Sequence, residues 1–348
     1  MSNTIVLTGG GTAGHVMPNI ALLPNLEKHF DKICYIGSRN GIEKKLIQNI
    51  KNIDYFEIDS VKLIRKLTLK NIAIPFVLLK AIRQSIKILK KLQPKVIFSK
   101  GGYVAVPVVI AGSILKIPII AHESDSSIGL ANKIIYKKCD TMFFSFEEAM
   151  KGYEKKGVYS GSPIRQEFLH CTKKYNINID QNKKTIVVVG GSLGSVALNN
   201  TIVEALPKLQ NYNIINIVGN GKINNNIYYP NYFQIEFVDD IASLYNIADI
   251  VISRAGSNAI FELLAMQKPM ILIPLPKDES RGDQIINAKI FGSKGFAIVI
   301  LQENLTTDLL LDKIQSLEKN KNKFISTMSR YPICNSNNII VQKLSKYI

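Results

Sequence analysis

Cysteines are few in this sequence, and they follow no recognisable spacing. The four of them, Cys34, Cys139, Cys171 and Cys334, fit neither a metal site nor a disulfide framework. Scattered cysteines of this kind are typical of a reducing compartment, and we assign them no chemistry. The first expected strand already begins at Thr4, which leaves no room for a signal peptide, so we expect the chain to start in the cytosol.

Long apolar runs and low-complexity segments are also absent. The most apolar stretch, residues 104–121, is interrupted by Pro107, Lys116 and Pro118, so it predicts a helix followed by a strand and not a membrane span. The composition is that of a globular protein, because 46% of the 348 residues are hydrophobic and 20% are charged. A chain of this length is expected to form two domains, each with its own core.

Acidic residues are missing from one long stretch. None occurs between Asp59 and Glu123, where twelve residues are Lys or Arg, so we expect one face of one domain to be strongly positive. The net charge of +17 does not by itself indicate a nucleic-acid partner, because 37 of the 44 basic residues are Lys and the chain is also rich in Ile and Asn. That pattern is typical of an AT-rich coding bias, and we expect no nucleic-acid binding.

The acid-free stretch contains an amphipathic helical pattern. Apolar residues recur at helical spacing at Leu78, Leu79, Ile82, Ile86 and Leu89, and basic residues surround them at Lys80, Arg83, Lys87, Lys90 and Lys91. Pro75, in the apolar segment just before, is expected to break the helix. One interpretation is a crossover helix with a solvated basic face. The other is that residues 64–79 place an apolar loop with a basic rim on an anionic membrane surface.

Short apolar runs alternate with helical patterns through the whole chain. The runs are 4–7, 33–36, 55–58, 96–99, 117–121 and 142–145 in the first half, and 185–189, 214–218, 234–238, 249–253, 269–273 and 296–299 in the second. This alternation predicts an α/β fold of two doubly wound, Rossmann-like parallel-sheet domains that face a central cleft. We place the domains at 1–163 and 164–336, followed by a helical segment at 337–348.

Glycine-rich turns follow the first expected strand of each half. The first turn, Gly9-Gly10-Gly11-Thr12-Ala13-Gly14-His15, lets backbone N–H groups approach a ligand at a helix N-terminus, where phosphate or a developing oxyanion is favoured. Its spacing is not the G-x-G-x-x-G of dinucleotide sites, which argues against NAD or FAD. The second turn, residues 189–195, is a weak signal alone. Two such turns in one cleft suit a diphosphate ligand such as a nucleotide sugar, and Arg165 could supply a bidentate charge for it.

A third loop, residues 253–262, again leads from a strand into a helix. Glu262 lies about one and a half turns into that helix, where a carboxylate can accept both hydroxyls of a ribose. The alternative is a solvent-exposed helix residue. Further on, residues 283–288 carry amide and carboxylate groups, including Gln284 and Asn287, that suit sugar hydroxyls, although alone they are typical of a helix surface.

Taken in series, these blocks resemble the MurG family of glycosyltransferases. They are the turn at 9–15, Lys100-Gly101-Gly102-Tyr103, His122-Glu123, residues 129–132 and 161–165, Gly190-Gly191-Ser192 and Arg254-Ala255-Gly256, in the family's order over nearly the whole chain. The resemblance implies the GT-B fold and an inverting transfer of N-acetylglucosamine (GlcNAc). The donor is UDP-GlcNAc, and the acceptor is the C4 hydroxyl of the N-acetylmuramic acid (MurNAc) in lipid I, undecaprenyl-pyrophosphoryl-MurNAc-pentapeptide; the product is lipid II.

The resemblance also implies a setting. The reaction belongs to peptidoglycan synthesis, and so to cell shape and cell division, and it takes place at the cytoplasmic face of the plasma membrane. The enzyme is expected there as a peripheral protein on the anionic inner surface, among other cell-wall synthesis proteins, with its C-terminal helix returning to the first domain.

Matching positions carry the implied roles. His15 is similar to the family residue near the base that takes the acceptor's proton, and imidazole suits that task at neutral pH. The implied substrate contacts are Thr12, Ala13 and Gly14 beside acceptor and donor sugar, Asp125 near the substrates, Arg165 and Ser192 at the diphosphate, Val238 at the uracil, Ser257, Asn258 and Ala259 at the phosphate end, Glu262 at the ribose, and Gln284 and Asn287 at the GlcNAc hydroxyls.

The chain departs from the family pattern at a few positions. Ser124-Asp125 stands where Gln-Asn is expected after His-Glu, so a carboxylate replaces an amide, and Leu193 and Asp283 each stand where glutamine is usual. No metal or other cofactor is expected, since helix N-termini and Arg165 can neutralise the leaving diphosphate. Two alternatives remain open. One is a UDP-GlcNAc 2-epimerase, which shares the plan and the donor but needs no lipid acceptor; the other is a non-catalytic sugar-nucleotide-binding protein.

Overall fold

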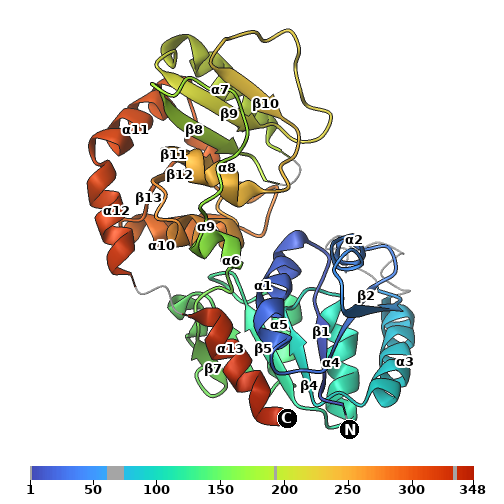
Figure 1. Ribbon diagram of the computed structural model, residues 1–348. Helices are drawn as coiled ribbons and strands as arrows, with labels where there is room; N and C mark the ends of the chain where they lie inside the picture. Colours follow the sequence, from blue (N-terminus) through green and yellow to red (C-terminus); the bar gives the residue numbers. More distant parts are fainter. Residues whose placement is uncertain (1, 61–73, 192–193, 332–334) are drawn as a thin grey trace. The chain divides into compact units, whose positions relative to one another are not determined.

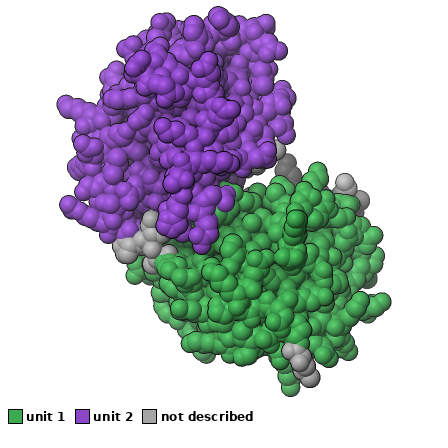
Figure 2. Space-filling view, in the orientation of Figure 1, with its two compact units in different colours: residues 1–165, 333–348 green, residues 166–332 purple. Residues whose placement is uncertain are grey.

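The computed structural model describes residues 2–60, 74–191, 194–331 and 335–348. The chain divides into two compact units, which Figure 2 draws in green and purple: the first comprises residues 1–165 and 333–348, the second residues 166–332. Each unit contains one sheet of parallel strands with helices packed on it (Figure 1). The predicted α/β fold with two doubly wound parallel sheets is confirmed.

The sheet of the first unit has seven strands in the order β3-β2-β1-β4-β5-β6-β7. The bounds are β1 Thr4–Thr8, β2 Lys32–Ser38, β3 Ile53–Ile58, β4 Val96–Ser99, β5 Ile119–Glu123, β6 Thr141–Phe144 and β7 Gly157–Tyr159. The central strands β1 and β4 are buried along their whole length, as expected for a parallel sheet covered on both faces. Six of the seven strands match predicted runs. The sequence analysis missed β7, which has three residues and so shows no periodicity.

The helices of the first unit connect these strands. They are α1 Met17–Leu26, α2 Ile42–Ile47, α3 Ile74–Leu92, α4 Ala105–Ile114 and α5 Leu130–Tyr136, with short 3-10 turns at Ala13–His15 and Glu147–Met150. As predicted, the apolar run 104–121 divides into a helix and a strand. The expectation that Pro75 breaks the helix is wrong, because Pro75 lies within α3.

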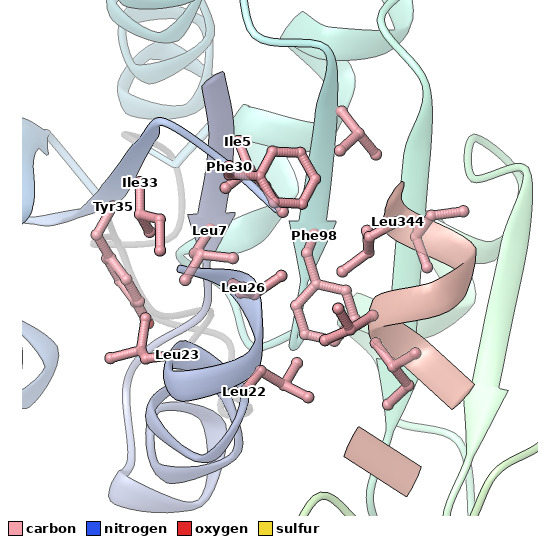
Figure 3. Close-up of a cluster of buried hydrophobic side chains, with 14 of the residues drawn as sticks. Ile5, Leu7, Leu22, Leu23, Leu26, Phe30, Ile33, Tyr35, Phe98 and Leu344 are labelled. Carbon is pink, nitrogen blue, oxygen red and sulfur yellow. The ribbon is translucent and has the colours of Figure 1, made fainter. Parts of the chain in front are cut away.

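The last helix, α13 Ser336–Leu344, completes the core of the first unit. Ile340, Val341 and Leu344 are buried in the same cluster as Ile5 of β1 and Leu26 of α1, and Figure 3 shows Leu344 beside the labelled core residues. A short 3-10 turn, Ser345–Tyr347, follows. The end of the chain therefore supplies apolar surface to a core that is otherwise built from residues far away in the sequence.

The second unit repeats the plan with six strands in the order β10-β9-β8-β11-β12-β13. The strands are β8 Lys184–Val189, β9 Tyr212–Ile217, β10 Tyr232–Ile235, β11 Ile250–Ser253, β12 Met270–Leu272 and β13 Ala297–Val299, and the helices are α6 Gln166–Leu169, α7 Val196–Ala205, α8 Ile241–Ile247, α9 Ser257–Ala265, α10 Asp283–Ser293, α11 Thr307–Lys319 and α12 Lys321–Arg330. The predicted strand 234–238 is shifted, because β10 ends at Ile235 and the residues after it form a loop.

Each sheet reverses its strand order at one place. In the first unit the order reverses between β1 and β4, and in the second between β8 and β11. The connections on the two sides of such a point leave the sheet in opposite directions, so a crevice opens at the carboxyl ends of the two strands. Both glycine-rich turns follow one of these strands, which places each of them where an open α/β sheet binds its ligand.

Candidate functional site

The first half of the candidate site lies where β1 ends. Gly11 has a left-handed backbone, with φ of 88°, and a single 3-10 turn at Ala13–His15 precedes α1. The side chain of Thr12 is exposed, and its Oγ1 lies 2.9 Å from Nδ1 of the half-buried His15. The turn therefore presents a hydrogen-bonded hydroxyl and imidazole at its rim.

A buried carboxylate, Glu43 of α2, holds this turn from behind. Its Oε2 accepts the backbone N–H of Gly11 at 3.2 Å, and its Oε1 accepts the backbone N–H of Ser38 at 3.0 Å together with the Ser38 hydroxyl. A Cβ atom on Gly10 would lie 2.6 Å from the carboxyl carbon of Glu43. Because the Gly11 amide is engaged by the protein's own carboxylate, we attribute the chemistry of this turn to its side chains. The sequence analysis did not single out Glu43.

The loop after β4 packs directly against the first turn. Gly102 has a φ of 80°, and a Cβ atom on it would collide with the carbonyl oxygen of Gly10 and lie 3.3 Å from Nδ1 of His15. A Cβ atom on Gly11 would meet the ring of Tyr103 at 2.5 Å. Both loops therefore need glycine, since only glycine adopts these backbone angles freely and leaves room for so close an approach.

The end of β5 adds a buried imidazole and a buried carboxylate. His122 is fully buried, and its Nε2 lies 3.2 Å from a backbone carbonyl oxygen. Burial, and then the charge of Lys100, hold the pKa of His122 well below its ordinary value, so the ring is neutral. Glu123 accepts the backbone N–H of Asp125 at 3.1 Å and the side-chain amide of Asn132 at 2.9 Å. These bonds fix the loop that carries the partly exposed Asp125.

The second half of the candidate site begins where β8 ends. Ser192 and Leu193 lie outside the described residues, so the predicted diphosphate contact of Ser192 falls there as well. On either side of them Gly191 and Gly194 are left-handed, with φ of 88° and 68°. Ser195 caps α7 by accepting a backbone N–H at 3.3 Å. The turn thus leads into a helix N-terminus, which favours negative charge.

Arg254, at the end of β11, connects this turn with the neighbouring strand. Its side chain is buried; Nη1 donates to the carbonyl oxygens of Ile273 and Pro274 at 3.1 and 3.3 Å, and Nη2 donates to Oγ of Ser195 at 2.6 Å. Burial lowers the pKa of Arg254, and Glu279 opposes that shift. A guanidinium nevertheless stays charged in proteins. The sequence analysis named Arg254 only as part of a motif, whereas the structure places a buried positive charge behind the second glycine turn.

The remaining donor-side candidates gather around α9. Residues 257–259 form its first turn, and Glu262 lies half-buried in the next. Two amides of α10 hold the loop that leads into α9. Gln284 Oε1 accepts the N–H of Ala255 at 3.2 Å, and the fully buried Asn287 donates from Nδ2 to the carbonyl of Ala255 at 3.2 Å. Both side chains therefore position the backbone next to the expected phosphate site.

The structure sorts the predicted site residues between the two units. Thr12, Ala13, Gly14, His15 and Asp125 lie beyond the carboxyl ends of β1 and β5, whereas Val238, Ser257, Asn258, Ala259, Glu262, Gln284 and Asn287 follow β10, β11 and β12. Val238 is buried in the loop between β10 and α8, and Arg165 is the last residue of the first unit before the division. Their substrate contacts stay predictions.

Among the described residues, no group of three or more His, Cys, Asp or Glu side chains is placed to hold a metal ion. Two neighbouring carboxylates at the end of β3 are paired with lysines instead: Glu57 with Lys44 at 2.7 Å, and Asp59 with Lys80 at 2.6 Å. Hydrogen bonds from these lysines hold the pKa of each carboxyl below its ordinary value.

An apolar cavity of about 140 Å³ adjoins the first half of the site. It is lined by α3, α4 and α5, through residues such as Val77, Val106 and Ile134, and by Tyr103. Because Tyr103 also packs against Gly11, the cavity and the first glycine turn share a wall. A long apolar group attached to a ligand of the turn would find its complement here.

Comparisons with known proteins give the family. Residues 5–144 match the family model described as Glycosyltransferase family 28 N-terminal domain, and residues 185–343 match Glycosyltransferase family 28 C-terminal domain. A protein of Clostridium botulinum (strain Alaska E43 / Type E3), named UDP-N-acetylglucosamine--N-acetylmuramyl-(pentapeptide) pyrophosphoryl-undecaprenol N-acetylglucosamine transferase, is 47% identical over 99% of this chain and 98% of its own. A Clostridium tetani protein of the same name is 45% identical over 100% and 99%.

Solved structures share the fold. The crystal structure of MurG from Acinetobacter baumannii superimposes with a TM-score of 0.78 at 24% identity, covering 99% of both chains. A UDP-GlcNAc 2-epimerase of Neisseria meningitidis bound to UDP-GlcNAc superimposes with a TM-score of 0.68 at 14% identity, again over 99% of both chains. At these identities the likeness concerns the fold alone. The domain matches and the curated relatives go further, and with them the chain belongs to glycosyltransferase family 28.

Proposed function

We propose that the chain is an inverting glycosyltransferase that moves GlcNAc from UDP-GlcNAc to the C4 hydroxyl of MurNAc in lipid I, giving lipid II for peptidoglycan. The observation that carries this proposal is the identity of 47%, over 99% of the chain, to a relative named for that transfer. The local chemistry agrees, since one glycine turn offers a hydroxyl and an imidazole while the other leads into a helix N-terminus.

On the acceptor side, His15 is the proposed base. The C4 oxygen attacks the anomeric carbon of GlcNAc, the bond from that carbon to the β-phosphate oxygen breaks, and the hydroxyl proton passes to the imidazole. Since Nδ1 is engaged with Thr12 at 2.9 Å, we assign the proton to Nε2. The Thr12 hydroxyl then fixes the ring's orientation, and Ala13 and Gly14 leave space for the two sugars beside it.

On the donor side, the second unit holds UDP. Val238 binds the uracil through its backbone, Glu262 accepts the ribose hydroxyls, and residues 257–259 present the N-terminus of α9 to the phosphates. Gln284 and the fully buried Asn287 hold the loop before α9, and the partly exposed Gln284 also serves the GlcNAc hydroxyls. Arg165 and Ser192 complete the diphosphate site, so the leaving group is neutralised without a metal ion.

Membrane attachment is proposed through the first unit. Phe76 and Leu79 of α3 are 72% and 53% exposed, next to the apolar cavity and to the basic positions of the same helix. An apolar patch with a basic rim suits an anionic bilayer surface, and the cavity suits the first isoprenyl units of the acceptor. Most of the predicted membrane segment 64–79 lies outside the described residues. Among the residues that are described, no helix is long and apolar enough to span a bilayer.

The test is the release of UDP from UDP-GlcNAc by the purified protein, with and without a soluble lipid I analogue, in EDTA. We expect release that depends on the acceptor, survives EDTA and yields the disaccharide. His15→Ala should reduce the rate by about 100-fold or more, the range for loss of a general base. The control is His29→Ala, which removes an exposed imidazole at the other end of α1.

Other outcomes would contradict the proposal in distinct ways. Release of UDP without acceptor, or epimerisation of the sugar, would indicate the 2-epimerase alternative. Binding of UDP-GlcNAc without any release, with or without acceptor, would indicate the non-catalytic alternative. Loss of transfer in EDTA that Mg²⁺ restores would contradict the metal-independent mechanism alone.

A further inference from the structure

Lys100, the residue after β4, carries a charged side chain in the protein interior, which is unusual for lysine. Its side chain is 1% exposed, and Lys100 and Arg254 are the two basic residues among those described whose side chains are buried. Its backbone N–H donates to the carbonyl of Thr8 at 2.8 Å, so it lies directly beside the first glycine turn. A Cβ atom on Gly9 would lie 3.0 Å from the Cβ of Lys100. The lysine therefore lies beneath the proposed acceptor side, next to the first glycine turn.

The ammonium reaches across to the next strand. Nζ of Lys100 donates a hydrogen bond to Oγ of Ser124, the residue between Glu123 and Asp125 in the loop after β5. Glu123 is 5% exposed and, besides the N–H of Asp125, accepts the N–H of Gly129 at 3.0 Å. The hydroxyl that the lysine binds thus belongs to a residue that has a carboxylate residue on each side of it in the sequence.

A cation beside two neighbouring carboxylates helps to keep both in place. Like charges repel one another more strongly where burial lowers the dielectric, and a nearby positive charge offsets that repulsion. Lys100 brings a cation to this loop through its bond to Ser124, whereas the neighbouring His122 is neutral. The charges of Glu123 and Asp125 in turn oppose the fall in the pKa of Lys100 that burial causes.

We propose that Lys100 is a positioning residue of the acceptor site, which balances Glu123 and Asp125 through its contact with Ser124 and so holds the Asp125 carboxylate in place for the acceptor sugar. The proposal rests on the transferase function proposed above. It predicts that the effects of Lys100 and Asp125 on transfer activity depend on one another. The carboxylate of Asp125 supports activity only when the ammonium of Lys100 is present, and without that ammonium a neutral amide at position 125 gives the higher activity.

The experiment is a double-mutant cycle in the soluble-acceptor assay. Lys100→Met keeps the length of the side chain and removes its charge, and Asp125→Asn removes the paired carboxylate. Lys100→Met should lower kcat/KM for the acceptor by about 100-fold and leave the KM for UDP-GlcNAc unchanged, as expected for loss of one partner of a buried charge pair. The double variant should recover at least about tenfold of that loss. Lys137→Met, at an exposed position of the same unit, is the matched control.

Each outcome separates the proposal from its alternatives. If Lys100→Met keeps its activity within about threefold of the wild type, the proposal is contradicted. The same holds if Asp125→Asn lowers the activity of Lys100→Met by the same factor as it lowers the activity of the wild type, because the two residues then act independently. If Lys100→Met unfolds and the double variant unfolds with it, as thermal denaturation would report, Lys100 is a structural residue and the proposal is overturned. An inactive wild-type protein that binds UDP-GlcNAc refutes the transferase function instead, and the cycle then has no baseline.

Discussion

Replacing Asn337 by alanine should weaken the attachment of the C-terminal helix to the first unit. The side chain is 7% exposed and makes three hydrogen bonds to distant backbone: Oδ1 accepts the N–H of Ile164 at 3.1 Å, and Nδ2 donates to the carbonyls of Ile164 and Ala21 at 2.8 and 3.0 Å. Alanine leaves one buried donor and two acceptors without this partner. At about 1 kcal/mol for each bond, the cost is about 3 kcal/mol.

The assay is hydrogen exchange of the amides of α13, which measures the free energy of local opening. A loss of about 3 kcal/mol corresponds to about 150-fold faster exchange. The neighbouring Asn338 is the control, since its side chain is exposed and bonds to Asn25 at 2.8 Å on the surface. Asn338→Ala should change exchange by less than about threefold. If the two variants exchange alike, the buried bonds of Asn337 do not hold the helix and our reasoning is wrong.

Three other perturbations test the first unit. Glu43→Gln replaces one of the two oxygens that accept hydrogen bonds from Gly11 and Ser38 by an amide nitrogen, which cannot accept them. We expect kcat to fall by about tenfold or more and the binding of UDP-GlcNAc to stay unchanged. The control is Glu57→Gln, which changes an exposed carboxylate paired with Lys44 and should leave kcat unchanged. Replacing Phe76 and Leu79 by serine should reduce turnover on vesicle-borne acceptor and spare a short-chain soluble one; equal loss on both would contradict a role at the membrane. Burial lowers the pKa of Lys100 to about 8 from its ordinary 10.5, so the unfolded chain binds the proton more tightly. The free energy of unfolding should therefore rise between pH 8 and 10.5, by at most about 3 kcal/mol, and urea unfolding of Lys100→Met should lack that rise.

The arrangement of the fold was predictable from the sequence because its signals are local. A β-branched run such as 185–189 followed by glycine marks a buried strand and its end wherever it occurs. The failures are local as well: β7 is too short to show a period, and the run 234–238 continues past the point where β10 stops pairing with β9 at Ile235. Pairing partners decide where a strand ends, and a single segment does not reveal its partner.

The sequence signals for the candidate site are clearest where glycine marks a turn. The turns at 9–15 and 189–195 stand out because a glycine cluster follows the first strand of both halves, although the second turn alone is a weak signal. Glu43, by contrast, sits in the pattern Glu-Lys-Lys of a short helix and looks like a solvated surface residue, yet it is fully buried against Gly11. Its role depends on a contact between residues 32 positions apart, which neither composition nor spacing encodes.

In each unit a buried charged side chain lies behind the glycine turn, and the two charges have opposite signs. Behind the first glycine turn lies the carboxylate of Glu43, bonded to Gly11, and behind the second lies the guanidinium of Arg254, bonded to Ser195. In the proposed reaction His15 on the first turn gains a proton, and the diphosphate at the second turn gains negative charge as the sugar departs. A fixed negative charge stabilises the first change and a fixed positive charge the second, and each acts more strongly for being buried. The residue that holds each turn in place thus also carries the sign of charge that would stabilise the proposed step at that turn.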